Sequence, residues 1–207
     1  MESLPALLLF TFSASITPGP NNVMILTSGL NYGIRRSMPH LLGIVLGFSF
    51  MVLVIGFGFG LLFARFPLLH TVIKIAGVIY LLFLAWRVWT TSPREIEGTN
   101  KPPLNFLQAA LFQWLNPKAW MMATSGIATF ASAEASTVQI MLIAAVFMIA
   151  SFTCTGSWLV FGAALKKLLS QPGPRSIFNR VMAALLVLSL LPTLQELATT
   201  FGLGTSN

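Results

Sequence analysis

The chain has 207 residues, of which 56% are hydrophobic and only 8% are charged. Soluble globular domains are about 45–50% apolar and about 25% charged. Twelve Lys and Arg, five Glu and no Asp cannot cover a water-exposed surface of this size, so the composition excludes a soluble globule and indicates an all-α integral membrane protein.

Hydrophobic runs separated by charged or Pro/Gly-containing breaks predict six transmembrane helices, since one span needs roughly 20 apolar residues. In chain order they cover residues 4–31, 38–64, 68–90, 104–131, 137–165 and 177–200. We therefore expect a single transmembrane domain, 1–207, with a first half at about 1–92, a cytoplasmic linker at about 93–103 and a second half at about 104–207.

Two of these helices, the first and the fourth, are interrupted near their middle. TPGPNN at 17–22 breaks the first span and LNPKAW at 115–120 breaks the fourth. A proline cannot donate to the carbonyl four residues earlier, which predicts free carbonyls at Ala14, Ile16 and Gln113. Free carbonyls at membrane depth are tolerated where they line a cavity or bind a ligand.

Three spans per half is an odd number, so two halves that share a fold are inserted upside-down relative to each other. This predicts a 3+3 inverted repeat with helices 1 and 4 broken. Paired Pro/Gly interruptions at corresponding positions of two halves are the best pointer in a sequence to a transport site.

The residues at the breaks are suited to binding a zwitterion. Thr17-Pro18 and Asn116-Pro117 each combine an N-cap residue with proline at the first helical position, and a helix N-terminus attracts anions. Lys118 adds a positive charge, and the freed carbonyls and Asn oxygens accept from an ammonium group. The predicted substrate-binding set is Thr17, Pro18, Gly19, Pro20, Asn21, Asn22, Asn116, Pro117 and Lys118. The alternatives are that the prolines only kink the helices and that Lys118 snorkels or pairs with a carbonyl.

No catalytic, metal or cofactor site is expected. The chain has one cysteine, Cys154, and two isolated histidines, His40 and His70, which begin the second and third spans and are expected at the membrane interface. We therefore expect no enzyme activity.

The basic residues predict the orientation of the chain. Three of the predicted loops, with their helix ends, hold Arg35, Arg36, Arg87, Arg94, Lys101, Lys166, Lys167, Arg175 and Arg180, against Arg65 and Lys74 on the opposite side. By the positive-inside rule, the first set is cytoplasmic and both termini lie outside. Because these charges lie in short clusters between apolar runs, they indicate topology and contact with membrane lipid, and no nucleic acid is expected to bind.

Three motifs of the sequence are those of a known family. They are TPGPNN in the first span, Gly43 and Gly47 in a GxxxG pattern in the second, and NPKAW in the fourth. The chain resembles the LysE/RhtB family of amino-acid exporters over essentially its whole length. The resemblance implies a multi-pass protein of the bacterial inner membrane that exports amino acids or close metabolites, driven by the proton motive force. It favours the homoserine/threonine and cysteine/O-acetylserine branch over the lysine branch.

The acidic residues bear on the substrate. The chain has no Asp, and its five Glu lie at or near span ends, so a dibasic substrate would find no carboxylate and a neutral amino acid is expected. The same absence leaves protonation of Lys118 as the visible route for proton coupling. A membrane channel or a structural membrane subunit remains the alternative, and a homo-oligomer stays open.

Overall fold

The computed structural model describes residues 4–59, 65, 67–90, 102–132, 135–166 and 172–200, and all regular structure in these ranges is helical. The elements are α1 (Leu4–Ile16), α2 (Pro20–Val54), η1 (Ile55–Phe59), α4 (Pro67–Thr90), α6 (Phe106–Phe112), η2 (Gln113–Leu115), α7 (Pro117–Phe130), α8 (Thr137–Leu165), α9 (Pro172–Leu188) and α10 (Leu191–Thr200). The predicted all-α class is confirmed. Most of the predicted linker 93–103 lies outside the described residues.

Four helical segments of the described chain are long and apolar enough to cross a membrane. They are Pro20–Gly58, Thr71–Thr90, Thr137–Leu165 and Ser176–Thr199, and two shorter apolar helices cover Leu4–Ile16 and Phe106–Leu115. The shorter helices are the parts of the predicted first and fourth spans that precede their breaks, so each break leaves a piece shorter than a bilayer is thick. The count of six spans stays a prediction.

Where a loop is predicted between the first and second spans, the chain leaves the helical conformation at one glycine. Helix α2 runs through this region, with non-helical backbone angles only at Gly33 (φ 76°, ψ 174°). Glycine adopts a positive φ without the steric penalty of a Cβ. The chain therefore changes direction at Gly33, close to the basic pair Arg35 and Arg36.

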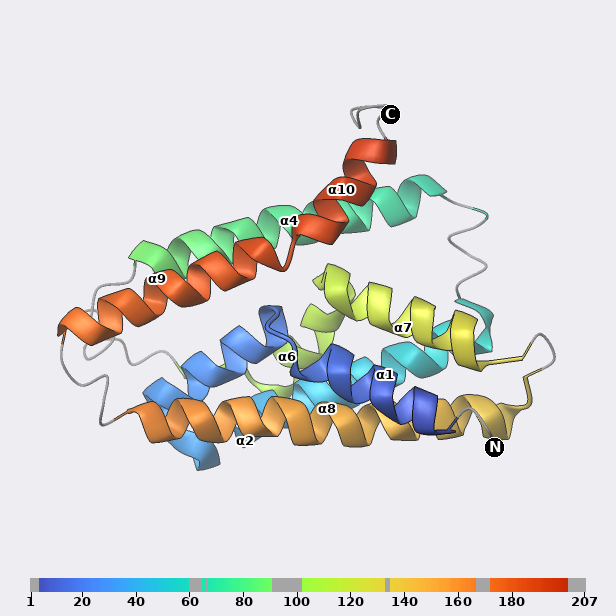
Figure 1. Ribbon diagram of the computed structural model, residues 1–207, viewed down its shortest axis with the longest axis horizontal. Coiled ribbons are helices and arrows are strands. Elements are labelled where there is room, and N and C mark those ends of the chain that lie inside the picture. The colour runs from blue at the N-terminus through green and yellow to red at the C-terminus, as the bar shows by residue number, and fades with distance from the viewer. Residues whose placement is uncertain are drawn as a thin grey trace.

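The helices form two layers (Figure 1). One layer contains α1, α2, α6, α7 and α8, with α2 packed along α8, and the other contains α4, α9 and α10, with α4 packed along α9. The start of α1 and the end of α10 lie in the same half of the long axis. The junction of α1 with α2 and the start of α7 both lie near its middle.

Glycines allow the first layer to pack closely. A Cβ at Gly43 would lie 2.3 Å from the carbonyl oxygen of Phe106, and one at Gly47 would lie 2.6 Å from the Cα of Ala110, so the GxxxG pattern is the contact surface of α2 with α6. Gly162 of α8 approaches α2 in the same way, because its Cβ would lie 2.1 Å from the carbonyl oxygen of Leu26. These contacts fix α2 against both neighbours around the breaks.

His40 is buried inside this layer. Its side chain is 2% exposed, and Nδ1 lies 2.8 Å from the hydroxyl of Ser28, twelve residues earlier on the far side of the turn at Gly33. The expected interfacial depth of His40 stays a prediction. The turn at Gly33 folds the two parts of α2 together and brings His40 into the interior.

Candidate functional site

The first break separates α1 from α2 and starts the second helix later than predicted. Helix α2 begins at Pro20, with Gly19 as an extended N-cap (φ −174°, ψ 178°) that contributes no side-chain bond. The prediction that Thr17-Pro18 starts the helix is wrong: the Thr17 hydroxyl donates to the carbonyl of Ala14 at 2.8 Å. A residue before proline avoids the helical region, so Gly19 stays extended and the helix can begin only at the second proline, Pro20.

The carbonyls at the end of α1 are freed as predicted, and side chains bind them. The carbonyl of Ile16 accepts from the indole of Trp158 at 3.1 Å, and that of Ser15 accepts from the amide of Asn22 at 2.8 Å. The Asn22 amide also donates to the carbonyl of Thr17 at 2.9 Å. Donors from α2 and α8 therefore stabilise the break, and the sequence alone gave no sign of Trp158 in this role.

The second break has the predicted cap. One 3₁₀ turn, η2, ends at Asn116, whose backbone is extended (φ −91°, ψ 105°), and α7 begins at Pro117. The Asn116 side chain accepts from the backbone N–H of Lys118 at 3.2 Å. The carbonyl of Gln113, which Pro117 frees, accepts from the N–H of Asn116 at 3.2 Å. Asn116 and Pro117 thus begin a new helix, as expected.

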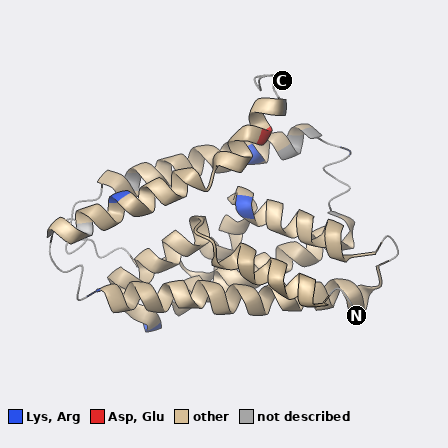
Figure 2. Ribbon diagram, viewed as in Figure 1, with Lys and Arg blue, Asp and Glu red and all other residues tan. Residues whose placement is uncertain are grey.

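Lys118 connects the two breaks. Its ammonium donates to the Thr17 hydroxyl at 2.6 Å, to the Thr17 carbonyl at 2.8 Å and to the Pro18 carbonyl at 3.4 Å. Pairing with a carbonyl was one of the alternatives for Lys118, and it is the contact observed. The negative end of the α1 dipole also favours a cation at this place. Figure 2 shows basic colour at the start of α7, well inside the fold.

A second contact, between Asn21 and Gln113, also joins the breaks. Asn21 donates from Nδ2 to the Oε1 of Gln113 at 2.8 Å, and Gln113 donates from Nε2 to the Oδ1 of Asn21 at 3.1 Å. Gln113 is fully buried and also donates to the carbonyl of Ala109. Gln113 was expected only to lose a backbone bond, so its amide is a site residue that the sequence did not indicate.

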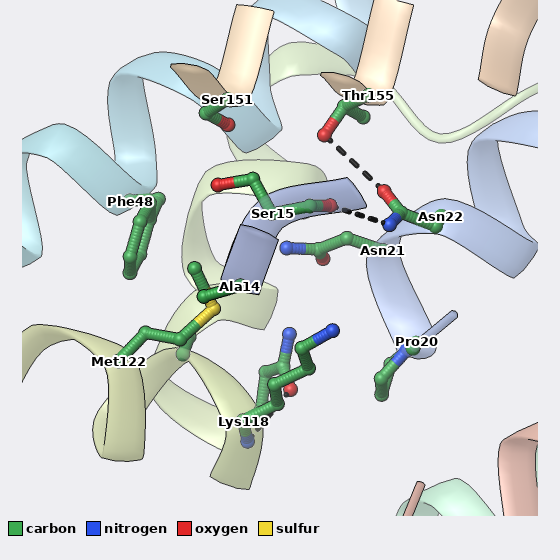
Figure 3. A pocket seen from close by; sticks show the side chains of 13 residues that line it. Ala14, Ser15, Pro20, Asn21, Asn22, Phe48, Lys118, Met122, Ser151 and Thr155 are labelled. Atoms are coloured by element: carbon green, nitrogen blue, oxygen red, sulfur yellow. Dashed lines mark hydrogen bonds between the residues drawn. The ribbon is translucent and has the colours of Figure 1, made fainter. Parts of the chain in front are cut away.

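The breaks border a small cavity of about 30 Å³, lined by polar and apolar groups, with room for about one water molecule (Figure 3). Six of the predicted residues line it: Gly19, Pro20, Asn21, Asn22, Asn116 and Lys118. Seven lining residues were not predicted: Ala14, Ser15, Phe48, Ala119, Met122, Ser151 and Thr155. Ser151 and Thr155 are buried hydroxyls one helical turn apart on the long apolar run of α8, and this spacing is the signal that could have found them.

One polar side chain gives this cavity unused hydrogen-bonding capacity. The Ser15 hydroxyl is buried and has no hydrogen-bond partner among the described residues. It faces the same space as Ser151 and Lys118. A buried hydroxyl without a partner is costly, and a bound polar ligand removes that cost.

A larger cavity of about 350 Å³ lies beside the first, between α1 and α7 on one side and α9 and α10 on the other. Thr17 and Pro18 line it, whereas Pro117 lines neither cavity. The remaining lining residues are Phe10, Ala14, Lys118, Met121, Met122, Ser125, Leu188, Ser189 and Pro192. In the described chain, no Asp or Glu lines either cavity, and no three His, Cys, Asp or Glu residues form a group that could hold a metal ion.

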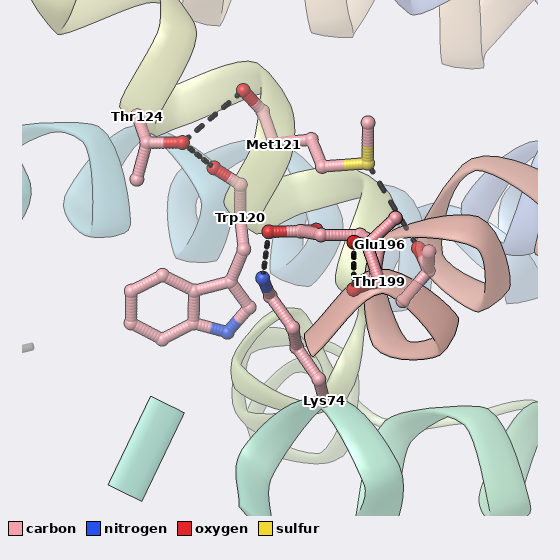
Figure 4. Close-up of polar contacts among 7 residues, drawn as sticks. Lys74, Trp120, Met121, Thr124, Glu196 and Thr199 are labelled. Atoms are coloured by element: carbon pink, nitrogen blue, oxygen red, sulfur yellow. Dashed lines mark hydrogen bonds and ion pairs between the residues drawn. The ribbon is translucent and has the colours of Figure 1, made fainter. Parts of the chain in front are cut away.

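One ion pair lies away from both cavities. Lys74 of α4 donates to the carboxylate of Glu196 of α10 (Figure 4), and Lys74 is 9% exposed. We expected these residues only as charges near span ends. The pair holds two helices of the second layer together, and its partners are separated by 122 positions, which no local pattern links.

Comparisons with known proteins show the family of the chain. A family model described as LysE type translocator matches residues 12–189, a range that includes both breaks. The chain belongs to the LysE translocator family. It is 31% identical to the cysteine/O-acetylserine efflux proteins of Escherichia coli strain K12 and of Shigella flexneri, over 189 residues that cover 89% of this chain and 93% of each relative. No solved structure matches.

Family membership confirms the resemblance carried by TPGPNN and NPKAW. Translocators of the LysE family are transport proteins and not enzymes, and their many apolar helices are those of a multi-pass membrane protein. The site between the two breaks is therefore the place to look for a transported molecule.

Proposed function

We propose that this LysE family translocator is a secondary transporter that exports neutral amino acids or related small metabolites from the bacterial cytoplasm across the inner membrane. The observation that carries the proposal is the ammonium of Lys118 bound to the oxygens of Thr17 and Pro18, beside a cavity between two helix starts. An ammonium group already occupies these oxygens, which supports their use for the α-ammonium of an amino acid.

The carboxylate of the substrate has a complementary place in this proposal. Helices α2 and α7 both begin at the cavity, with Gly19 and Asn116 as their N-caps, and run away from it in opposite directions. Helix N-termini and a lysine together favour an anion. The nine predicted residues are thus proposed to hold the two charged ends of one zwitterion.

The walls of the larger cavity support a neutral substrate side chain. They combine apolar groups such as Phe10 and Met121 with the hydroxyls of Ser125 and Ser189, and no Asp or Glu among the described residues would pair with a second cation. Small, uncharged and weakly polar side chains suit these walls. The relatives are named for cysteine and O-acetylserine, which are molecules of this kind.

The proposal includes six spans in a 3+3 inverted repeat, both termini outside, and protons as the coupling ion. The pairing of α4 with α9, which belong to the corresponding third and sixth predicted spans, supports the repeat. Lys118 is the ionisable group that both cavities share, which supports it as the proton carrier.

The test is export of a panel of amino acids from loaded cells that contain this protein, with cells containing the Lys118→Met variant as the matched control. Saturable, stereoselective efflux of neutral amino acids that stops when the pH gradient is collapsed is the expected result. Non-saturable efflux would instead indicate a channel, and no protein-dependent efflux of any amino acid would leave a structural subunit.

A further inference from the structure

We propose that the side chain of Lys118 is a gate between the two cavities, and that the gate is closed in this structure. A solute moves between the smaller and the larger cavity only when the ammonium leaves the oxygens of Thr17 and Pro18. This inference rests on the proposed function only in naming what passes through the gate.

The positions of the two cavities place Lys118 at their boundary. Three residues line both cavities: Ala14, Lys118 and Met122. None of the residues around the smaller cavity is exposed, and none of those around the larger cavity is buried. The shared wall therefore separates a space lined by buried and half-buried residues from one lined by half-buried and exposed residues, and Lys118 is its one long charged side chain.

The contacts of Lys118 hold this wall closed and can be exchanged. Its three hydrogen bonds end on oxygens of Thr17 and Pro18, which the break in α1 leaves available. Within the described part of the chain, the ammonium is not paired with a carboxylate. Its release therefore leaves no buried negative charge without a partner. Release therefore costs a few charge-assisted hydrogen bonds, which another ammonium can replace.

A zwitterionic substrate has the groups that open such a gate. Its α-ammonium can take the place of the Lys118 ammonium on the Thr17 and Pro18 oxygens. Lys118 is then free to bind the carboxylate of the same molecule. Opening is in this way coupled to the presence of both charged ends, and a small ion that lacks them leaves the gate closed.

Gly19 gives a way to move Lys118 without removing its charge. The backbone of Gly19 is extended, so alanine can adopt its conformation, but a Cβ there would lie 2.8 Å from the Cδ of Lys118 and 3.1 Å from its Nζ. The three nearest atoms are all in the flexible part of the Lys118 side chain. Gly19→Ala should therefore push the ammonium off its oxygens and leave the backbone in place.

Access to the two cavities can be tested with introduced cysteines, because the chain has only one cysteine of its own to replace. In a Cys154→Ala background, Ser15→Cys places a thiol in the smaller cavity and Ser125→Cys places one in the larger cavity. Reaction of each with a small, negatively charged methanethiosulfonate reagent is followed in intact cells. The ratio of the Ser15→Cys rate to the Ser125→Cys rate measures access through the wall.

With Lys118 in place, we expect the ratio to be small. Lys118→Ala and Gly19→Ala should each raise it by about tenfold or more, the effect of losing one or two hydrogen bonds to a charged group. Gly156→Ala is the matched control, because a Cβ there meets only Leu41, at 4.0 Å, and it should leave the ratio unchanged.

An unchanged ratio in both Lys118→Ala and Gly19→Ala would overturn the gate. A rise in Lys118→Ala alone would also overturn it, because the position of the ammonium would then not control access. Should Lys118→Ala fail to reach the membrane, Gly19→Ala decides, because it moves the ammonium without removing it. Access is measured without transport, so failure of the gate and failure of the proposed export activity are told apart.

Discussion

The side-chain amides of Asn21 and Gln113 exchange two hydrogen bonds across 92 positions of the chain. Asn21 follows the first break and Gln113 precedes the second, while Lys118 follows the second break and binds Thr17, at the start of the first. The two contacts are counterparts of each other. A two-fold axis in the membrane plane between two inverted halves would produce this arrangement, so it supports the proposed repeat.

Replacing one amide of the Asn21–Gln113 pair should destabilise the junction. Gln113→Leu leaves the buried end of Asn21 without its partner and should lower the free energy of unfolding by about 0.5–2 kcal/mol, the range for interhelical hydrogen bonds in membranes. Thermal unfolding of the purified protein in detergent measures the loss.

A double-mutant cycle shows whether the effect comes from the pair. Asn21→Leu combined with Gln113→Leu should cost less than the sum of the two single variants, because neither amide is then left unpaired. Strict additivity would show that the two hydrogen bonds do not couple the breaks.

The prolines of the first break should be required for export. Replacing Pro18 and Pro20 together with Ala removes the steric reason for the break and favours a continuous helix, since each interior proline costs a helix about 3 kcal/mol. A straight helix would close the cavity and move Thr17 away from Lys118. We expect normal amounts of protein in the membrane and at least a tenfold loss of export, measured as efflux from loaded cells.

Pro39 provides the matched control for this substitution. It is an exposed proline inside α2 and lines neither cavity, so Pro39→Ala should keep export near the normal rate. Normal export by the Pro18 and Pro20 double variant would show that the break is only a kink.

The breaks could be predicted from sequence because proline acts locally. The exact start of α2 could not, since a helix could resume at Pro18 or only at Pro20, and the Thr17 hydroxyl donates to the Ala14 carbonyl and does not cap a helix N–H. The contact of Trp158 with Ile16 joins residues that are 142 positions apart. Such contacts are set by helix packing, which no local pattern encodes.

The Lys74–Glu196 pair should stabilise the second layer without affecting substrate binding. Glu196→Gln leaves the buried ammonium of Lys74 without its carboxylate, and we expect a loss of about 1–3 kcal/mol in the free energy of unfolding. Replacing both residues with Met should recover most of this loss. Because neither residue lines a cavity, the apparent affinity for the exported amino acid should not change, and a clear change would assign the pair a role in transport.

The orientation of the chain can be tested with reporter fusions. A reporter fused after Asn207 should report the outside and one inserted in the 91–103 loop should report the cytoplasm, because nine basic residues lie at the predicted cytoplasmic loops and two on the other side. A cytoplasmic C-terminus in a full-length, active fusion would contradict both the six-span count and the inverted repeat.

Lys118 should be essential for export, and two substitutions separate its roles. Lys118→Met removes the charge from the shared wall and should abolish or severely reduce export, while insertion is unchanged or eased because a mid-membrane charge is costly. Normal export and apparent affinity in this variant would place the whole anion site on the helix starts.

Lys118→Arg keeps the charge but replaces a compact ammonium with a planar guanidinium that does not lose its proton. If Lys118 only attracts a carboxylate and leaves the Thr17 and Pro18 oxygens in exchange, Arg should retain part of the export. If Lys118 must lose its proton in each cycle, Arg should be as inactive as Met, although substrate still binds. Equilibrium binding of a labelled neutral amino acid to the purified variants, measured beside efflux, distinguishes the two roles. An Arg variant that binds the amino acid but does not export it would identify Lys118 as the group that loses a proton in each cycle.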